Sequence, residues 1–412
     1  MKAVKQVLGN NLQQYTMVVV LVLLAIVFDF ASGGRMLTPT NFQDLLAGNA
    51  YVLVLAIGMV MVIVVGHIDL SVGSVAGFVG MAVALSIKSF GLPWWLGLLL
   101  GLAVGLVIGM WHGWWVSKVG IPGFIVTLAG MMIFRGLIVF TSGSISQPVP
   151  GEFTVLGAGY LPEWGPDTGL NNSTVVLGLL AMAWFVYSEI NKRRHAVARG
   201  VDSPVWAMAT RIVLIVAVLG YLTFLFGSGR PGTSFPIPGL VLVVLVVLYH
   251  TLTQRTTLGR HIYAVGGNKA AAALSGVNTA RTYFFVMANM SFLAAVAGIL
   301  AVGKSTAAGP ADGNMWELDA IAAVFIGGAA VSGGIGTVIG SMVGGLMMAV
   351  LNSGLMLLGV QSDRTQIIKG LVLLAAVAFD VLNKQQGRPS IIGQMQRALS
   401  RQSGEASQKK TD

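Results

Sequence analysis

Residues 51–76 read YVLVLAIGMVMVIVVGHIDLSVGSVA. Residues 51–65 are apolar or glycine, and they form the centre of a run from 47 to 66 that is long enough to cross a bilayer, since about 20 apolar residues suffice. A lone acid, Asp69, follows, and a second apolar segment rich in small residues begins at once. An apolar span, a break at an acid and a further span indicate a helix bundle built inside a membrane.

Apolar runs of this kind recur along the whole chain. We expect an all-α polytopic membrane protein with about twelve transmembrane helices, or about ten to twelve if some Gly-rich segments are re-entrant. The segments in question are 69–87, 318–331 and 337–358. We expect a single transmembrane domain over 1–382 and a polar cytoplasmic tail over 383–412. The predicted spans are 16–31, 47–66, 69–87, 93–116, 122–140, 174–190, 211–227, 238–253, 282–302, 318–331, 337–358 and 364–382.

The composition agrees with a membrane protein and excludes several other classes. Of 412 residues, 55% are apolar and 10% are charged, whereas an ordinary soluble domain has about 25% charged residues. A soluble enzyme, a disordered chain and a nucleic-acid-binding domain are therefore excluded. The chain has no Cys, which excludes disulfides and thiolate catalysis. Motifs such as H-E-x-x-H and G-x-S-x-G are also absent, so we expect no catalytic residue, no metal and no cofactor.

The positions of Lys and Arg predict the orientation. With the N-terminus in the cytoplasm, 18 of the 25 basic residues fall in cytoplasmic segments and 5 in outer segments, as the positive-inside rule requires. Both termini are then cytoplasmic, and the net charge of +10 faces anionic membrane lipid, not nucleic acid. Lys2 and Lys5 precede the first run as in a signal peptide, but no small-x-small site follows, so we expect an uncleaved span.

Glycine patterns predict close packing between helices. Two stripes repeat every fourth residue, which places glycines on one helix face. Residues 298–305, GILAVGKS, match the phosphate-binding loop pattern. They close an apolar helix with no strand before it, so we expect no nucleotide to bind there. The stripes are Gly97, Gly101, Gly105, Gly109 and Gly113, and then Gly336, Gly340 and Gly344.

A few ionisable residues fall inside apolar segments, where each needs a partner. Arg135 interrupts residues 130–140 and predicts a salt bridge, a carbonyl contact or contact with a transported solute. Lys369 would reach outward or pair with Asp363.

Two acidic segments resemble each other, 65–74 and 317–328, and each has an x-[IL]-D core followed by small residues. Because they fall on opposite predicted sides of the membrane, they suggest a duplicated unit with inverted topology. Asp69 and Asp319 could equally serve as plain helix caps. The candidate residues of a solute pathway are Asp69, Ser71, Arg135, Glu317 and Asp319.

At these segments the sequence resembles the permease subunits of bacterial ABC importers for monosaccharides, such as ribose, galactose and xylose. The layout is closest to the xylose and multiple-sugar members, because simpler ribose-type members resemble the chain without the spans around 174–227. His67 stands where relatives often have Gly or Glu, and Ala329-Ala330 where they often have Thr-Ser. The matching stretches are Gly58-Met59, 68–74 IDLSVGS, 122–130 PGFIVTLAG with Arg135-Gly136, Gly259-Arg260 with 262–268 IYAVGGN and 274–276 LSG, and 317–323 ELDAIAA.

The resemblance implies an inverted-repeat permease in the bacterial inner membrane, working as a homodimer or pseudo-dimer. Two cytoplasmic ATPase domains would bind ATP, and an extracytoplasmic sugar-binding protein would deliver the substrate to outer segments 141–173 and 303–316. The cytoplasmic loop 254–281 would hold the region that docks on the ATPase. The residues implied for this coupling are Gly267, Asn268, Lys269, Ala272, Leu274 and Ser275.

Two alternatives stay open from the sequence. One is an ABC permease for another small polar solute, such as an amino acid or a nucleoside. The other is a secondary transporter that uses Asp69, Asp319 or Arg135 to couple uptake to protons or sodium. Uptake that is lost only when the proton gradient collapses would favour the secondary transporter.

Overall fold

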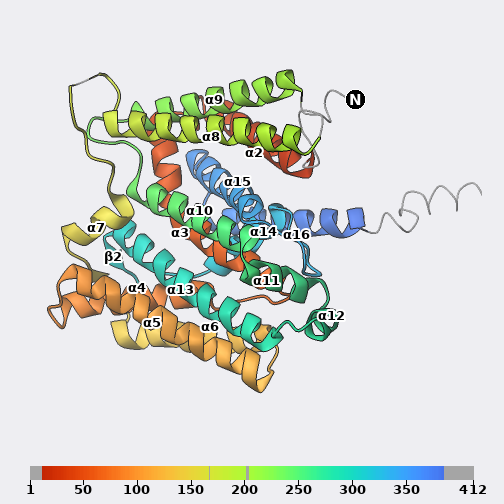
Figure 1. Cartoon of the computed structure of the whole chain (residues 1–412). Coiled ribbons are helices and arrows are strands. Elements are labelled where there is room, and N and C mark those ends of the chain that lie inside the picture. The colour runs from red at the N-terminus through yellow and green to blue at the C-terminus, as the bar shows by residue number, and fades with distance from the viewer. Residues whose placement is uncertain (1–11, 167, 201–203, 385–412) are drawn as a thin grey trace, which may run out of the picture.

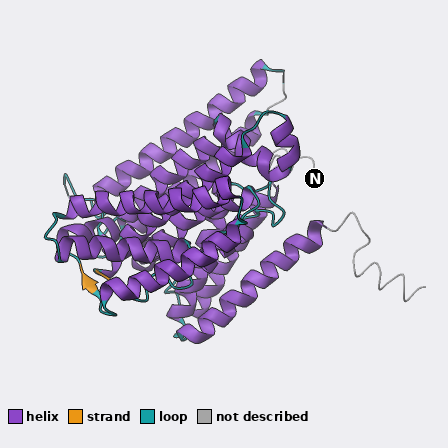
Figure 2. Ribbon diagram, turned by 90° about the horizontal axis from the view of Figure 1, so that it is seen from below, coloured by secondary structure: helices purple, strands orange, loops and turns teal. Residues whose placement is uncertain are grey.

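The computed structural model describes residues 12–166, 168–200 and 204–384, and most of that part is helical (Figures 1 and 2). One short antiparallel pair joins β1 (Gln147–Pro148) to β2 (Ala307–Ala308). The predicted all-α class of membrane protein is confirmed. Eight of the described helices are long and apolar enough to cross a membrane, so the expected number of twelve is not confirmed. The tail predicted at 383–412 lies outside the described residues except for the last two residues of α16.

Two groups of four helices form the centre of the molecule. The first group comprises α3 (Pro39–Val64), α4 (Val72–Lys88), α5 (Trp94–Trp114) with the π-turn η1 (Trp115–Val119), and α6 (Gly123–Ser142). The second comprises α13 (Thr279–Ser305), α14 (Trp316–Ile326), α15 (Val338–Leu357) and α16 (Ser362–Lys384). In each group a long helix is followed by a shorter one, which we call a half-helix, and then by two more helices.

The two groups exchange helices, because each half-helix packs on the long helix of the other group. α4 and α5 pack against α13, and α14 and α15 pack against α3. α3 and α13 also pack against each other in the core (Figure 1). This reciprocal arrangement is the pattern expected of a duplicated unit with inverted topology.

The half-helices run toward opposite ends of the bundle. α4 ends beside the β1–β2 pair, where Lys88 Nζ donates to Gln147 Oε1 at 3.0 Å. α14 leads into a turn over residues 327–337, and Gly334 N there donates to the carbonyl of Val64 at 2.8 Å. With 11 residues, α14 rises about 16 Å, roughly half of a bilayer core. The helix predicted over 318–331 therefore ends at Ile326, and the rest of that segment is a turn.

The remaining helices surround this centre. α8 (Asn172–Ala198) and α9 (Val205–Gly227) pack on each other, and α9 also contacts α3 at the edge of the bundle (Figure 1). α2 (Leu12–Ala31) packs on α15, and α7 (Gly151–Ala158) packs on α13. α10 (Ile237–Arg255) leads to α11 (Thr257–Gly267) and α12 (Lys269–Leu274). The N-terminal end of α2, at Leu12, and the C-terminal end of α16, at Lys384, lie at the same end of the bundle as α12 (Figure 1).

The glycine stripes work as helix contacts. Gly105 and Gly109 of α5 lie directly against the backbone of α13 at Ser291 and Ala288. In the second group, Gly344 of α15 lies against the carbonyl of Ala323 in α14. Close backbone approach of this kind needs residues without side chains.

The segment that matches a phosphate-binding loop also serves helix packing. Residues 298–305 all belong to α13. Gly298 contacts the carbonyl of Ala76 in α4, and Gly303 contacts Gly157 in α7.

Candidate functional site

The starts of α4 and α14 lie against each other inside the bundle. Gly73, in the first turn of α4, leaves room for the carbonyl of Gly313 and the carboxylate of Glu317, and a Cβ at this position would overlap both. Gly77, one turn further on, faces the carbonyl of Asp312 in the same way. We call this contact the half-helix junction, meaning residues 69–77 and 312–319. The junction brings together two chain segments that are far apart in the sequence.

Asp69 and Ser71 lie directly before α4 and are fully buried. The backbone N–H and the hydroxyl of Ser71 donate to Asp69 Oδ1 at 2.8 and 2.6 Å. Asp69 therefore orders the turn before the half-helix, but it is not the helix cap itself, because Ser71 is the N-cap residue of α4 and no side chain caps the first turn. A negative charge is also favourable at a helix N-terminus.

Three buried polar atoms at the junction have no hydrogen-bond partner within the described part of the chain. They are Asp69 Oδ2, Ser74 Oγ and Glu317 Oε2. Leaving a buried polar group unpaired costs about 1–3 kcal/mol, so native proteins rarely do it without water or a ligand. The junction is thus a polar region in an apolar bundle, where water or solute hydroxyls can complete the hydrogen bonding.

Two cationic side chains, which belong to different helices, contact residues 312–319. Arg135 of α6 donates from Nη1 to the carbonyl of Asp312 at 3.1 Å, which is the carbonyl contact that the sequence left open. Lys369 of α16 pairs with Asp319 at 3.0 Å, so the pairing with Asp363 suggested by the sequence is wrong. Glu317 lies within electrostatic reach of Arg135. All five residues predicted for the pathway therefore border the half-helix junction.

Other residues at the junction have no signal in the sequence. The ring of Tyr51, on α3, lies 4.1 Å from that of Trp316 at the start of α14, measured between centroids. Met315, directly before α14, has a φ of 66°, a left-handed conformation that is uncommon for a residue with a side chain. Gly313, with a φ of 79°, could have been suspected as a turn glycine, but its contact with Gly73 could not.

The predicted coupling residues lie at the C-terminal end of α11, in α12 and directly after α12, away from the half-helix junction. Asn268 caps α12 by accepting a hydrogen bond from Ala271 N at 3.0 Å. Ala272 is buried against the bundle, whereas Leu274 is 91% exposed and Ser275 is also exposed. Lys269 Nζ lies 5.1 Å from the centroid of the Tyr283 ring on α13. Gly267 ends α11 directly before the cap. This short helix presents a protruding apolar side chain to its surroundings.

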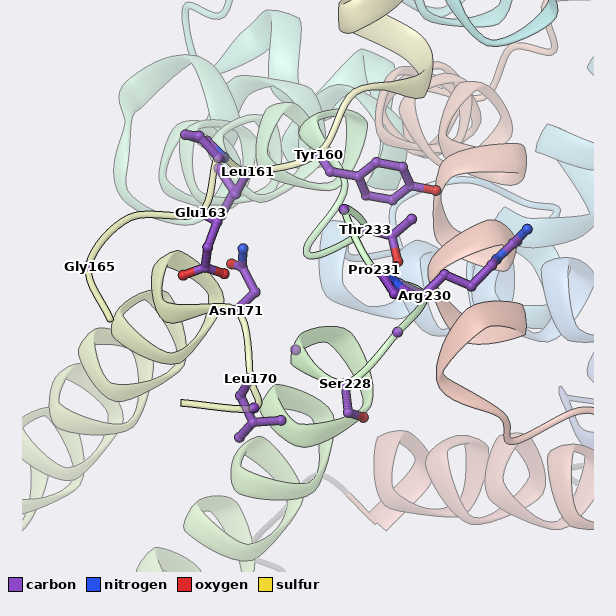
Figure 3. A pocket seen from close by; sticks show the side chains of 15 residues that line it. Tyr160, Leu161, Glu163, Gly165, Leu170, Asn171, Ser228, Arg230, Pro231 and Thr233 are labelled. Carbon is purple, nitrogen blue, oxygen red and sulfur yellow. Dashed lines mark hydrogen bonds between the residues drawn. The ribbon is translucent and has the colours of Figure 1, made fainter. Parts of the chain in front are cut away.

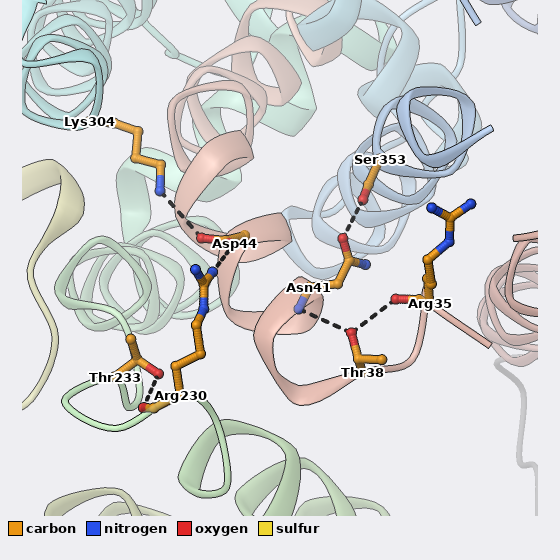
Figure 4. Close-up of polar contacts among 8 residues, drawn as sticks. All are labelled: Arg35, Thr38, Asn41, Asp44, Arg230, Thr233, Lys304 and Ser353. Atoms are coloured by element: carbon orange, nitrogen blue, oxygen red, sulfur yellow. Dashed lines mark hydrogen bonds and ion pairs between the residues drawn. The ribbon is translucent and has the colours of Figure 1, made fainter. Parts of the chain in front are cut away.

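At the opposite end of the bundle, one carboxylate on α3 contacts both a loop and the end of α13 (Figure 4). Asp44 of α3 pairs with Arg230 at 3.0 Å and with Lys304, at the end of α13, at 3.6 Å. Close by, Ser353 of α15 donates to Asn41 of α3 at 3.1 Å. Exposed ion pairs contribute about 1 kcal/mol or less each, so these contacts of Asp44 can break at low cost.

An open pocket of about 650 Å³ lies beside this ion pair, between residues 160–171 and 227–233 (Figure 3). Burial and then the Asp44 carboxylate raise the pKa of Tyr160, so its hydroxyl stays protonated at neutral pH. Glu163 Oε1 accepts from Asn172 N at 3.0 Å, which fixes one wall to α8. The polar lining residues are Tyr160, Glu163, Asn171, Ser228, Arg230 and Thr233.

The site shows no arrangement for holding a metal. Within residues 12–166, 168–200 and 204–384, no group of three or more His, Asp or Glu side chains is placed to bind an ion. At the junction, Asp319 pairs with Lys369, and Asp69 Oδ1 accepts from the backbone N–H and the hydroxyl of Ser71.

Comparisons with known proteins agree with this architecture. The family model described as the branched-chain amino acid transport system / permease component matches residues 41–377. The xylose transport system permease protein of Haemophilus influenzae is 37% identical over 91% of this chain and 98% of its own length. The corresponding protein of Escherichia coli K12 is 36% identical over 91% of this chain and 93% of its own.

A ribose import permease protein of Escherichia coli K12 is 33% identical over 91% of this chain and 95% of its own length. No solved structure matches the chain. The family match covers both helix groups and the half-helix junction between them. The chain therefore belongs to the family of permease components of the branched-chain amino acid transport system type.

Proposed function

We propose that this protein is the membrane-spanning permease subunit of an ATP-driven importer for a monosaccharide, such as xylose or several related sugars. The observation that carries the proposal is the 36–37% identity to xylose permeases over nearly the full length of both chains. The description of the family names branched-chain amino acids. The relatives that match over nearly their full length are named for the transport of xylose and ribose. The chain itself is not an enzyme, and ATP would be bound and hydrolysed by a separate partner subunit.

The solute would pass the half-helix junction. Its unpaired buried oxygens on Asp69, Ser74 and Glu317 offer acceptors to sugar hydroxyls. Ser71, Asp319 and Arg135 would hold the walls of this passage, because each is already engaged in a contact within the protein. A permease that receives its substrate from a binding protein needs only such weak contacts, since tight binding would slow release.

The external binding protein would dock at the end of the bundle that carries α7 and β2. Residues 141–166, 168–173 and 303–311 belong to that end, whereas residues 312–316 run inward to the half-helix junction. The pocket beside Tyr160 gives that end a concave surface. The ion pairs of Asp44 with Arg230 and Lys304 are weak enough to rearrange when a partner binds.

The opposite end would face the cytoplasm and the ATPase. Gly267, Asn268, Lys269, Ala272, Leu274 and Ser275 belong to that end, with Leu274 as the exposed contact. The described ends of α2 and α16 share this end, in line with cytoplasmic termini. We further propose that two copies of the chain assemble in the bacterial inner membrane, in contact with anionic lipid.

Transport by reconstituted complexes tests the function. Vesicles with the permease, its ATPase and its binding protein should accumulate radiolabelled xylose only with ATP, and collapse of the proton gradient should leave uptake unchanged. Unlabelled pentoses and hexoses as competitors define the range of sugars. Uptake that survives removal of ATP but stops with the gradient would contradict the proposal and favour ion coupling through Asp69 or Asp319.

A matched pair of variants tests the pathway. Glu317→Gln keeps the shape of the side chain and removes the charge at the junction, so we expect uptake to fall about tenfold, equivalent to about 1.4 kcal/mol. Asp363→Asn, at an exposed position in the first turn of α16, removes a charge outside the junction and the docking segments, so it is the control and should transport like the wild type. Equal uptake by both variants would remove Glu317 from the pathway.

A further inference from the structure

α11 and α12, with Tyr283 of α13, contact the loops next to both half-helices, namely the connection before α4 and the turn after α14. On the α4 side, the Tyr283 ring lies between Lys269 of α12 and His67 of the connection before α4. Lys269 Nζ is 5.1 Å from the Tyr283 centroid, and the His67 ring packs edge-on at 4.7 Å between centroids. A cation over an aromatic face is an attractive contact. The three side chains form a continuous row from α12 to the break before α4.

His67 has little freedom to move independently of this row. A Cβ at Gly123, the first residue of α6, would lie 2.9 Å from His67 Nδ1, so the ring already fills the space beside that helix. A displacement of Lys269 and Tyr283 is therefore transmitted to the residues just before Asp69, because packed side chains resist compression.

On the α14 side, the contact is a hydrogen bond from α11. The hydroxyl of Tyr263 donates to the carbonyl of Gly336 at 2.6 Å. Gly336 belongs to the turn 327–337, which connects α14 to α15. Burial raises the pKa of Tyr263, so its hydroxyl stays protonated and remains a donor at neutral pH.

The two contacts are joined by a backbone junction at the same end. The carbonyl of Val64, at the end of α3, accepts from Gly334 N at 2.8 Å. Gly266 of α11 lies directly against the same carbonyl, where a side chain would overlap it. A movement of the end of α11 is therefore expected to displace the end of α3 and the turn after α14 as well.

From these contacts we infer that Tyr263 and the row Lys269–Tyr283–His67 are positioning residues, which transmit movement of α11 and α12 to both half-helices at once. The inference rests on the proposed function, since α12 must be the segment that the ATPase moves. Both half-helices begin at the half-helix junction, where Gly73 meets Gly313 and Glu317. When the loops next to the half-helices move, both half-helices shift. The spacing at the junction then changes, and the junction is where the solute would pass.

The test separates transport from ATP hydrolysis in the full complex. Vesicles contain the permease, its ATPase and its binding protein, and radiolabelled xylose uptake and ATP hydrolysis are measured on the same sample. Tyr263→Phe removes the hydrogen bond to Gly336 and a longer one from Gln254 Nε2 at 3.4 Å, and it keeps the ring. We expect sugar taken up per ATP hydrolysed to fall about fivefold. Hydrolysis stimulated by the binding protein should change by less than about twofold, because α12 itself is intact.

A second pair of variants tests the other contact. Tyr283→Leu removes the ring between Lys269 and His67, and the same fall in uptake per ATP is expected. Tyr283→Phe is its control, because the ring stays and the Tyr283 hydroxyl makes no hydrogen bond within the described residues. Tyr221→Phe, on α9 with a side chain 52% exposed, is a second control.

The outcomes distinguish this inference from the proposed function. A wild-type complex that fails to take up xylose with ATP overturns the proposed function and this inference with it. A wild type that transports, with Tyr263→Phe and Tyr283→Leu at the wild-type ratio, overturns the inference alone. Copurification with the ATPase and the thermal midpoint identify a misfolded variant, and a folded variant with a wild-type ratio counts against the inference.

Discussion

The Lys369–Asp319 pair joins two helices within the apolar part of the bundle. Lys369 lies seven residues into α16, about 10 Å along the helix axis. The two side chains are 23% and 8% exposed, so neither charge has ready access to water. Removing one partner from a buried pair costs more than the pair itself contributes, because the remaining charge stays buried.

Lys369→Met should therefore lower the free energy of unfolding by about 3 kcal/mol. The thermal midpoint of the purified protein in detergent reports the loss. Adding Asp319→Asn to this variant should recover most of it, because no unpaired charge then remains. Lys192→Met is the control, since Lys192 is 68% exposed in its pair with Glu189 and should change stability by about 0.5 kcal/mol or less. Equal midpoints for the two lysine variants would refute the buried-pair interpretation.

Among the elements, the contact between α5 and α13 depends on glycine. Gly109 lies directly against the backbone of Ala288, so even a methyl group must push the two helices apart. Gly136, on α6, has no atom within 4 Å of the position where a Cβ would stand. The two glycines thus differ in packing and not in helical context.

Gly109→Ala should destabilise the protein by about 1–3 kcal/mol through overpacking. Gly136→Ala should be neutral or stabilise by up to about 1 kcal/mol, because Ala is the better helix former. Thermal midpoints of the two purified variants make the comparison. A Gly109→Ala variant as stable as Gly136→Ala would mean that α5 and α13 are not packed as described.

Hydropathy predicted most of the long helices, but not the short helices α7 and α11 or the half-helix junction. The spans and the glycine stripes follow from apolar runs and four-residue spacing. The length of α14 does not, because residues 318–331 stay apolar through Gly327 and Gly328, and a helix end at a glycine looks the same as a glycine within a span. The contact between Gly73 and Glu317 also has no local signal, because the two residues meet only after both helix groups have packed.

At the scale of the whole molecule, the two ends of the bundle should face different compartments. The chain has no Cys, so a single introduced thiol is the only reactive one. Glu152→Cys lies on exposed α7, and Ser275→Cys lies at the exposed end of α12. In intact cells a membrane-impermeant maleimide should label the first and not the second. Labelling of both after the membrane is permeabilised is the control, and the reverse pattern in intact cells would invert the proposed orientation.

The exchange of helices between the two groups has a consequence for how the chain is made. α3, α4 and α5 all pack against α13, which begins only at Thr279. The ribosome adds roughly 5–20 residues per second, so these helices wait on the order of ten seconds or more for their partner. During synthesis their glycine faces have lipid or other proteins as neighbours. A nascent chain that stops before Thr279 would keep the contacts of α4 with α5 and α6 but would lack the central helix against which α3, α4 and α5 pack.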